Sequence, residues 1–510
     1  MNLKTIYMDG NSLTLEDVIK VARNGIQVDL TDEAIQKVNK AREYVDKIVE
    51  EERVVYGITT GFGKFANVVI SKDEVKQLQV SLIKSHACGV GQHFGEEVVR
   101  AVMLLRANTL AKGNSGIRLE TLKTLISMLN KGVHPAIPEK GSLGASGDLA
   151  PLSHMVLVMF GEGEAYYEGQ LMSGKEAMEK AGIQTIELMA KEGLALINGT
   201  QVLTAVGALT TYDAINLAKL ADISSALSFE ALNGITDALD HKVHEARGHV
   251  GQINCAKNLL QILEGSHLTT HQGDIRVQDA YTLRCLPQIH GASKDAINYV
   301  RDKVSIEINA VTDNPLIFSD DDQVISGGNF HGQPMALAFD FLGIAIAELA
   351  NSCERRIERL VNPALSGLPA FLTEKGGLNS GFMIAQYSAA SLVSENKVLA
   401  HPASVDSIPS SANQEDHVSM GTIAARKAKD ILYNTSRVIA IELMASAQAL
   451  EFSDPTNLGE GTKVAYELVR QEVAKLEEDR IMYVDINKCA ELVDQNTIVK
   501  AVEEKIGELV

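Results

Sequence analysis

The sequence predicts a mainly α-helical protein in which long helices pack together as a bundle. Apolar residues recur at helical spacing, and several of these stretches exceed the ~11–12 residues of an average helix. Some stretches are apolar around much of the helix, as in residues 343–347, which indicates burial on several sides. Signals for strands are few. These observations favour a helical bundle over a fold built on a sheet.

The first helical pattern follows Thr31, a residue suited to cap a helix, and carries Val38 on its apolar face. A single hairpin signal joins residues 316–318 to residues 324–325 across the acidic turn 320–322. Further helical patterns cover residues 75–83, 96–111, 119–130, 201–232, 336–361, 380–399, 416–451 and 463–479.

The chain shows no internal repeat, no low-complexity segment and no obvious linker. We expect an N-terminal part, residues 1–220, that carries a loop around Ala145-Ser146-Gly147. Residues 221–510 would then form the helical core and the last helices. The boundary is approximate, because the two parts are expected to form one unit.

Composition excludes several classes of protein. The chain has 510 residues, 45% of them hydrophobic and 22% charged, as in a soluble globular protein. A formal net charge of −19 repels phosphate backbones and anionic lipids, so we expect no nucleic-acid partner. The apolar stretches are broken by charges such as Asp213 and Glu348, which argues against a membrane span.

Cysteine usage and the N-terminus indicate a cytoplasmic location. The five cysteines are scattered, odd in number and never paired as CxxC, so a disulfide framework is not expected. The first residues lack the apolar run of a signal peptide.

Histidine spacing gives no support for a metal site. His244 and His249 resemble a zinc-protease pair, but a separation of five residues places them on different faces of a helix. His241 shares a face with His244, as His267 does with His271, yet neither pair has an evident third ligand. A P-loop, a nucleophile elbow and a dinucleotide fingerprint are also missing. We therefore expect neither a metal nor an external cofactor.

The most informative stretch is residues 141–152, which contain Ala145-Ser146-Gly147. An isolated triplet of this kind would be only a tight turn. The whole stretch, however, resembles the signature G-[ST]-[LV]-[GS]-A-S-G-D-L-x-P-L of the aromatic amino acid ammonia-lyase family. In that family the triplet cyclises autocatalytically to 4-methylidene-imidazol-5-one. The Gly147 nitrogen would attack the Ala145 carbonyl, and loss of water would leave an electrophilic methylene carbon. Small residues permit the bend that this attack requires.

Other loops agree with the same resemblance, which covers essentially the whole chain. It implies that Tyr56 is the base for the β-proton, with Glu415 as the competing assignment. It also implies that Asn198 and nearby backbone amides stabilise negative charge on the ring. The matching segments are residues 56–63, 198–200, 278–285, 309–315 and 328–332.

The remaining implied roles concern the substrate's amino acid portion. Arg284 would pair with the substrate carboxylate, since its planar guanidinium suits a bidentate contact. Tyr281 and Gln278 would position the amine and the electrophile, and Phe330 would pack against the substrate.

His86 and Glu415 bear on the choice of substrate. Ser85-His86 and Gln414-Glu415 resemble the histidine branch of the family, which implies L-histidine as substrate and trans-urocanate as product, the first step of histidine degradation. Imidazole nitrogens buried without partners would cost ~1–3 kcal/mol each, and a carboxylate with a second imidazole satisfies both. Two plainer interpretations stay open, a core histidine for His86 and a helix-start carboxylate for Glu415. A tyrosine or phenylalanine lyase, an aminomutase and an inactive helical scaffold also stay open.

The resemblance implies a fold as well as a reaction. It predicts the long-helix bundle of the fumarase and aspartase lyases, with a loop-rich N-terminal part that carries the prosthetic group. It also predicts a homotetramer in which each active site draws loops from three subunits. The buried character of the late helices is compatible with that arrangement.

Overall fold

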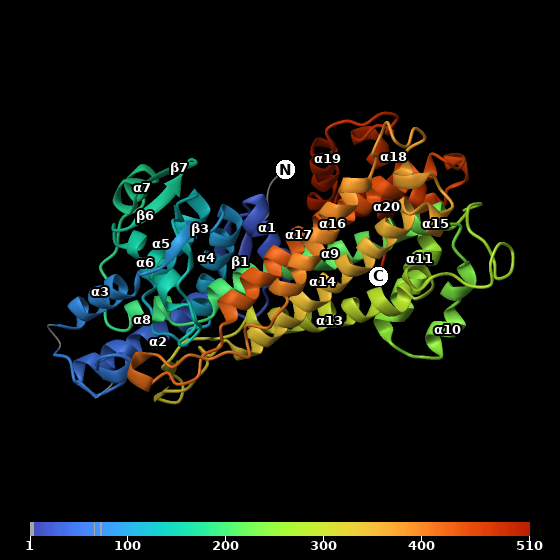
Figure 1. Cartoon of the computed structure of the whole chain (residues 1–510). Helices are drawn as coiled ribbons and strands as arrows, with labels where there is room; N and C mark the ends of the chain where they lie inside the picture. Colours follow the sequence, from blue (N-terminus) through green and yellow to red (C-terminus); the bar gives the residue numbers. More distant parts are fainter. Residues whose placement is uncertain (1–4, 66, 72–73) are drawn as a thin grey trace. The chain divides into compact units, whose positions relative to one another are not determined.

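The computed structural model describes residues 5–65, 67–71 and 74–510, and it divides the chain into two compact units. Unit 1 comprises Met1–Leu209, Arg301–Asp340 and Pro402–Arg426. Unit 2 comprises Thr210–Val300, Phe341–His401 and Lys427–Val510. Helices dominate the chain, as Figure 1 shows, so the predicted mainly α-helical class is confirmed.

Unit 1 combines helices with short strands. Its helices are α1 (Leu15–Asn24), α2 (Asp32–Glu50), α3 (Val75–His86), α4 (Glu96–Ala111), α5 (Leu119–Lys131), α6 (Leu149–Met159), α7 (Gly174–Lys180) and α8 (Glu192–Ile197), with 3-10 turns η1 (Gly63–Phe65) and η4 (Ser411–Asn413). Its strands are β1 (Ile6–Met8), β2 (Val28–Leu30), β3 (Val90–His93), β4 (His134–Pro135), β5 (Pro138–Lys140), β6 (Glu164–Tyr167), β7 (Gln170–Ser173), β8 (Leu316–Phe318) and β9 (Gln323–Ile325).

The strands pair locally and form no large sheet in the described part of the chain. Strands β1 and β2 are parallel, β3 pairs with β5, and β6 lies between β4 and β7. Strands β8 and β9 form an antiparallel hairpin in which Leu316 faces Ile325. The hairpin predicted from the sequence is therefore confirmed.

Helix α2 anchors the loop that carries Tyr56. It begins after Thr31, whose side chain accepts a hydrogen bond from the Ala34 backbone N–H, as the sequence predicts for a cap. Its apolar face packs into a buried cluster with Ile58, which is fully buried. Burial of Ile58 ties the chain two residues beyond Tyr56 to the core of unit 1.

Four long helices divide their residues between the two units. They are α9 (Gln201–Ala231), α13 (Leu286–Glu307), α14 (Gln333–Val361) and α17 (Gly421–Leu450), of which α9, α14 and α17 were predicted. Among the described helices, α14 alone is long and apolar enough to cross a membrane. However, 67% of its apolar window is buried within the chain, as in a core helix.

Unit 2 is almost entirely helical. Its other elements are η2 (Thr236–Leu239), α10 (His241–Glu245), α11 (Val250–Ile262), α12 (Tyr281–Arg284), α15 (Pro363–Ser366), η3 (Ala370–Leu372), α16 (Met383–Leu399), η5 (Pro455–Asn457), α18 (Glu460–Glu472), α19 (Met482–Asp494) and α20 (Thr497–Ile506). Helix α18 ends earlier than the predicted residue 479. Val473 is extended, and the Gln448 side chain accepts a hydrogen bond from the Leu476 N–H, which ties the chain to α17.

Candidate active site

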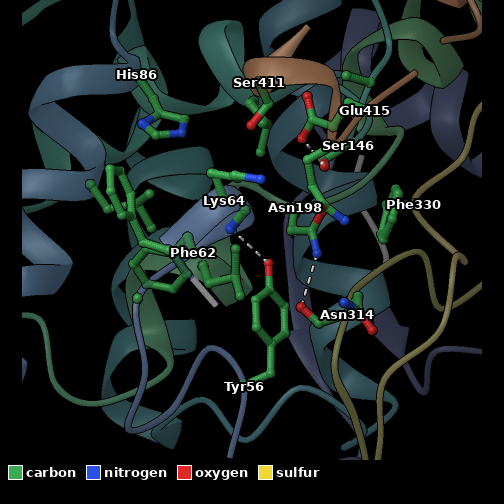
Figure 2. A pocket seen from close by; sticks show the side chains of 18 of the residues that line it. Tyr56, Phe62, Lys64, His86, Ser146, Asn198, Asn314, Phe330, Ser411 and Glu415 are labelled. Carbon is green, nitrogen blue, oxygen red and sulfur yellow. Dashed lines mark hydrogen bonds between the residues drawn. The ribbon is translucent and has the colours of Figure 1, made fainter. Parts of the chain in front are cut away.

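A cavity of about 1050 Å³ lies within unit 1 and collects loops that are far apart in the sequence (Figure 2). Seven of the predicted site residues contribute to its lining: Tyr56, His86, Ala145, Ser146, Asn198, Phe330 and Glu415. Gly147, the third residue of the triplet, directly follows Ala145 and Ser146 in the chain. The cavity is much larger than one amino acid, so other groups have room to enter it.

The Ala145-Ser146-Gly147 turn has little room for larger side chains. Gly147 has a φ of 74°, and a Cβ atom there would lie 2.0 Å from the Gly199 carbonyl oxygen. At Gly144, a Cβ atom would lie 2.2 Å from the Ser419 hydroxyl. Only glycine fits either position without displacement of the neighbouring loop. The turn is thus held in a tight bend, as cyclisation of the triplet would require.

Asp148 fastens this turn to the start of α9. Its carboxylate is fully buried and accepts hydrogen bonds from the Val202 and Leu203 N–H groups at 2.9 and 2.8 Å. Its other oxygen accepts from the hydroxyls of Ser142 and Thr422. Burial raises the pKa of Asp148, while these hydrogen bonds oppose that rise.

Glu415 lies directly beside Ser146. The Ser146 hydroxyl donates to Glu415 Oε1 at 3.1 Å, and the Ser410 hydroxyl donates to Oε2 at 3.1 Å. The loop before Glu415 has positive φ at Ser411, Ala412 and Asn413, a strained backbone that its surroundings must hold. The strain accompanies a carboxylate that is placed against the triplet.

Tyr56 points into the same cavity, with its hydroxyl at 3.3 Å from the Gly63 N–H that donates to it. Burial raises the pKa of the Tyr56 phenol, and the negative charges of Glu415 and Asp313 raise it further. The predicted base role needs the opposite shift. That role stays a prediction, and it requires a positive charge close to the phenol.

His86 is the last residue of α3, and its ring faces the cavity. The Ser85 hydroxyl donates to the Leu82 carbonyl at 3.0 Å, so the His86 Nδ1–H donates to Ser85 Oγ at 3.0 Å. This tautomer leaves Nε2 as an acceptor. Burial lowers the pKa of His86, which favours the neutral ring near neutral pH.

Asn198 follows α8 and presents an oxygen without a partner. Its amide nitrogen donates to Asp313 Oδ1 at 3.3 Å and to the Asn314 carbonyl at 3.0 Å. Its Oδ1 atom is buried and makes no hydrogen bond within the described residues. This geometry offers an acceptor, whereas stabilisation of negative charge on a ring would need a donor. The expected role of Asn198 therefore stays a prediction.

The other three predicted residues form a separate cluster in unit 2. Arg284 Nη1 donates to Gln278 Oε1 at 2.8 Å, and its guanidinium carbon lies 4.8 Å from the centre of the Tyr281 ring. Tyr281 is 68% exposed, and none of the three lines the cavity of unit 1. A site that uses these residues must bring them to the cavity from elsewhere.

Lys64 is a cavity residue that the sequence analysis did not single out. Its side chain extends into the cavity (Figure 2), and among the described lining residues it is the only lysine or arginine. The signal was available, because Lys64 directly follows the Tyr56–Gly63 loop. Lys64 thus brings a positive charge into the same cavity as Tyr56 and Glu415.

One group of potential metal ligands occurs in unit 2. Ligand atoms of Asp222, Cys255 and His290 lie within 4.8 Å of one another. The Lys294 ammonium contacts the Asp222 carboxylate and already neutralises it. At the zinc-protease-like spacing that the sequence analysis rejected, α10 ends at Glu245, and His244 is buried with bonds to the Ala238 carbonyl and to Gln252.

Comparison with known proteins places this arrangement in a family. The family model described as aromatic amino acid lyase matches residues 13–471. The chain belongs to the aromatic amino acid lyase family. Its relatives include the histidine ammonia-lyase of Alkaliphilus oremlandii, 69% identical over 99% of each chain. Another is the histidine ammonia-lyase of Caldanaerobacter subterraneus, 62% identical over 99% of each chain.

Solved structures of aromatic amino acid lyases share the fold. Histidine ammonia-lyase from Trypanosoma cruzi is 43% identical with a TM-score of 0.93, over 99% of this chain and 96% of that one. Tyrosine aminomutase from Streptomyces globisporus is 40% identical with a TM-score of 0.96, over 99% of this chain and 100% of that one. The fold alone therefore does not select the reaction or the substrate.

Proposed function

We propose that this enzyme eliminates ammonia from L-histidine to give trans-urocanate, with a prosthetic group formed from Ala145-Ser146-Gly147. The observation that carries the proposal is that His86 and Glu415 face the same cavity as the triplet. The names of the close relatives support the same substrate. A spectrophotometric assay with L-histidine, L-tyrosine and L-phenylalanine tests it. Urocanate from histidine alone is the expected result, and a cinnamate-type product from another substrate would contradict it.

The residues around the triplet fit a 4-methylidene-imidazol-5-one. Glycine at 144 and 147 permits the tight bend that cyclisation of the triplet requires. Such a group supplies an electrophilic carbon that no standard side chain offers. The chain needs neither a metal nor an external cofactor for this chemistry. The mass of the triplet peptide would report the loss of two waters.

Substrate recognition follows from two acceptors. His86 Nε2 and the Glu415 carboxylate both face the cavity, and they would accept hydrogen bonds from the two N–H groups of a protonated substrate imidazole. A phenyl ring offers neither group a hydrogen bond, so it gains nothing from the contacts that favour an imidazole. Phe330 lies on the opposite side of Ser146 from His86 in Figure 2 and packs against the substrate.

Substitution of His86 should change the substrate preference. We expect His86→Leu to lower kcat/KM for L-histidine by about 10- to 100-fold, because the imidazole N–H loses its acceptor. His93→Leu is a matched control, since His93 is half-buried, bonds to Tyr166 and does not line the cavity. Steady-state kinetics with histidine and phenylalanine check the prediction, and an unchanged ratio of the two kcat/KM values would contradict it.

Removal of the β-proton is assigned to Tyr56. Its phenol pKa is raised by burial and by Glu415 and Asp313, so a cation must lower it for the phenolate to form. Lys64 is the cation that this chain itself provides in the cavity. Arg284 supplies a second positive charge if it enters the site from another subunit.

The pH dependence separates the two candidate bases. A phenol that acts as base is active only when deprotonated, so its raised pKa moves the ascending limb of the kcat/KM profile to higher pH. Since Glu415 contributes to that rise, Glu415→Gln should move the limb to lower pH. Loss of the limb in Glu415→Gln would instead make Glu415 the base. Asp416→Asn, a neighbouring cavity residue, is the control and should leave the limb in place.

We also propose a cytoplasmic homotetramer in which each site is shared between subunits. Unit 2 exposes large apolar side chains that a partner would bury, including Phe341, Ile344, Ile384, Tyr387 and Val398. Gln278, Tyr281 and Arg284 are absent from the cavity lining and would come from another copy. All five cysteines are free thiols, which suits a reducing compartment.

Complementation tests the shared site. Ser146→Ala and Arg284→Met subunits, each inactive alone, should recover activity after they are mixed and reassembled, because some sites then contain only native residues. Light scattering gives the subunit number. A fully active monomer, or no recovery in mixed tetramers, would contradict the proposal.

An aminomutase is the competing function, because tyrosine aminomutase shares the fold at 40% identity. Product analysis separates the two, since a mutase yields a β-amino acid instead of free ammonia.

The division of the chain near residue 220 remains a proposal about its folding, and limited proteolysis would test it.

A further inference from the structure

A buried ion pair lies behind Asn198. The Lys191 ammonium is 2.6 Å from Asp313 Oδ2, and both side chains are fully buried. Asp313 Oδ1 accepts hydrogen bonds from the Asn198 amide nitrogen at 3.3 Å and from the Asn314 backbone N–H at 2.7 Å. The pair is therefore one step removed from the cavity and contacts it through Asn198.

The orientation of the Asn198 amide is fixed by these contacts. Its nitrogen faces two acceptors, Asp313 Oδ1 and the Asn314 carbonyl, so the nitrogen and oxygen positions cannot be exchanged. The Oδ1 atom is then the group that the side chain presents, and it is buried without a partner (Figure 2). Because Asn198 lines the cavity, a group bound there could supply the donor that this buried oxygen lacks.

Lys191 occupies its position at a cost. It lies at the start of α8 with a φ of 72°, a backbone conformation that a lysine seldom adopts. Two apolar residues in place of Lys191 and Asp313 would avoid the desolvation of two charges, which a buried pair often fails to recover. Stability alone is therefore a weak reason for the pair.

We propose that Lys191 and Asp313 are positioning residues for the reaction. Lys191 holds the Asp313 side chain in place, and Asp313 in turn accepts the hydrogen bond that keeps the Asn198 N–H groups turned inward. Asn198 Oδ1 then faces the site as an acceptor for the α-amino group of the bound amino acid. This inference rests on the proposed function, since it names the substrate group that Oδ1 receives.

A double-mutant cycle tests whether Lys191 acts through Asn198. Lys191→Met should lower kcat/KM by about 10- to 100-fold, the range of coupling between contacting groups. In an Asn198→Ala background the same substitution should lower it by no more than about twofold, because the group that it orients is gone. If the fold losses in kcat/KM of the two single variants multiply in the double variant, the two residues act independently and the proposal is wrong. If Lys191→Met does not fold, Asp313→Asn keeps the shape of the side chain and runs the same cycle.

Glu192→Gln is the matched structural control. Glu192 is the next residue, is fully buried, and pairs with Arg118 at 2.9 Å without contact to Asn198. It should lower the melting temperature as Lys191→Met does, with kcat/KM unchanged. If Glu192→Gln and Lys191→Met lower kcat/KM equally, the Lys191–Asp313 pair is only structural and the proposal is wrong.

Two further measurements separate the possible failures. The mass of the triplet peptide gives the fraction of subunits in which the triplet has cyclised, and each rate is divided by that fraction. If Lys191→Met protein contains no modified peptide, Lys191 does not act in turnover and the proposal is wrong. L-histidine binding, measured by calorimetry in a Ser146→Ala background, should weaken by similar factors in Lys191→Met and Asn198→Ala. Wild-type enzyme that releases no ammonia from histidine would reject the proposed function. Active wild type with multiplicative losses would reject only the positioning role.

Discussion

Ser146→Ala should abolish turnover while the protein stays folded. Alanine has no hydroxyl to lose as water, so no methylene carbon can form at the triplet. We expect kcat to fall by about 10⁴-fold or more, as for other enzymes that lose their principal reactive group. Initial rates of urocanate formation measure the loss, and the triplet peptide should keep the mass of the unmodified sequence.

Ser153→Ala is the control for this result. Ser153 is a buried serine on α6 whose hydroxyl donates to the Leu149 carbonyl at 2.8 Å, and it does not line the cavity. It should keep nearly full activity. A Ser146→Ala enzyme that retained substantial turnover would show that the triplet is not the electrophile.

Tyr56→Phe should give the second largest loss, about 10²- to 10⁴-fold in kcat, which is the usual contribution of a general base. The substitution removes only the hydroxyl and keeps the ring that lines the cavity. KM should change little, because Phe retains the packing. Rates measured across the pH range would also lose the ascending limb.

The matched control is Tyr44→Phe. The Tyr44 hydroxyl is buried in the core of unit 1 without a hydrogen-bond partner, so its removal should not lower stability or activity. Near-normal turnover by Tyr56→Phe would transfer the base role to Glu415.

Most long helices were predictable from the sequence and most short elements were not, although α13 was missed and the short β8–β9 hairpin was predicted. Helical periodicity over many residues identified α4 at Glu96–Ala111 with both bounds, and α9 to within a residue at its end. Pairs such as β4 with β6, and turns such as α12, are too short to carry a periodic pattern. The early end of α18 depends on Gln448, a contact from a distant helix that local sequence cannot reveal.

The site was predictable as a set of loops but not as a set of contacts. Motifs placed Tyr56, Ser146 and Glu415 together, and unit 1 gathers all three around one cavity. The direction in which Asn198 points depends on Asp313, more than a hundred residues away in sequence. The raised pKa of Tyr56 likewise depends on burial, which only the folded chain defines.

The hydrogen bond from Ser146 to Glu415 links cyclisation of the triplet to binding of the substrate. The hydroxyl that satisfies Glu415 Oε1 is the one that leaves as water if the triplet cyclises. Before cyclisation the Ser146 hydroxyl would therefore occupy Glu415 Oε1, and after cyclisation that oxygen would be free to accept a hydrogen bond from a substrate imidazole. Histidine affinity would rise only after the electrophile exists, so that a subunit unable to react would not sequester substrate.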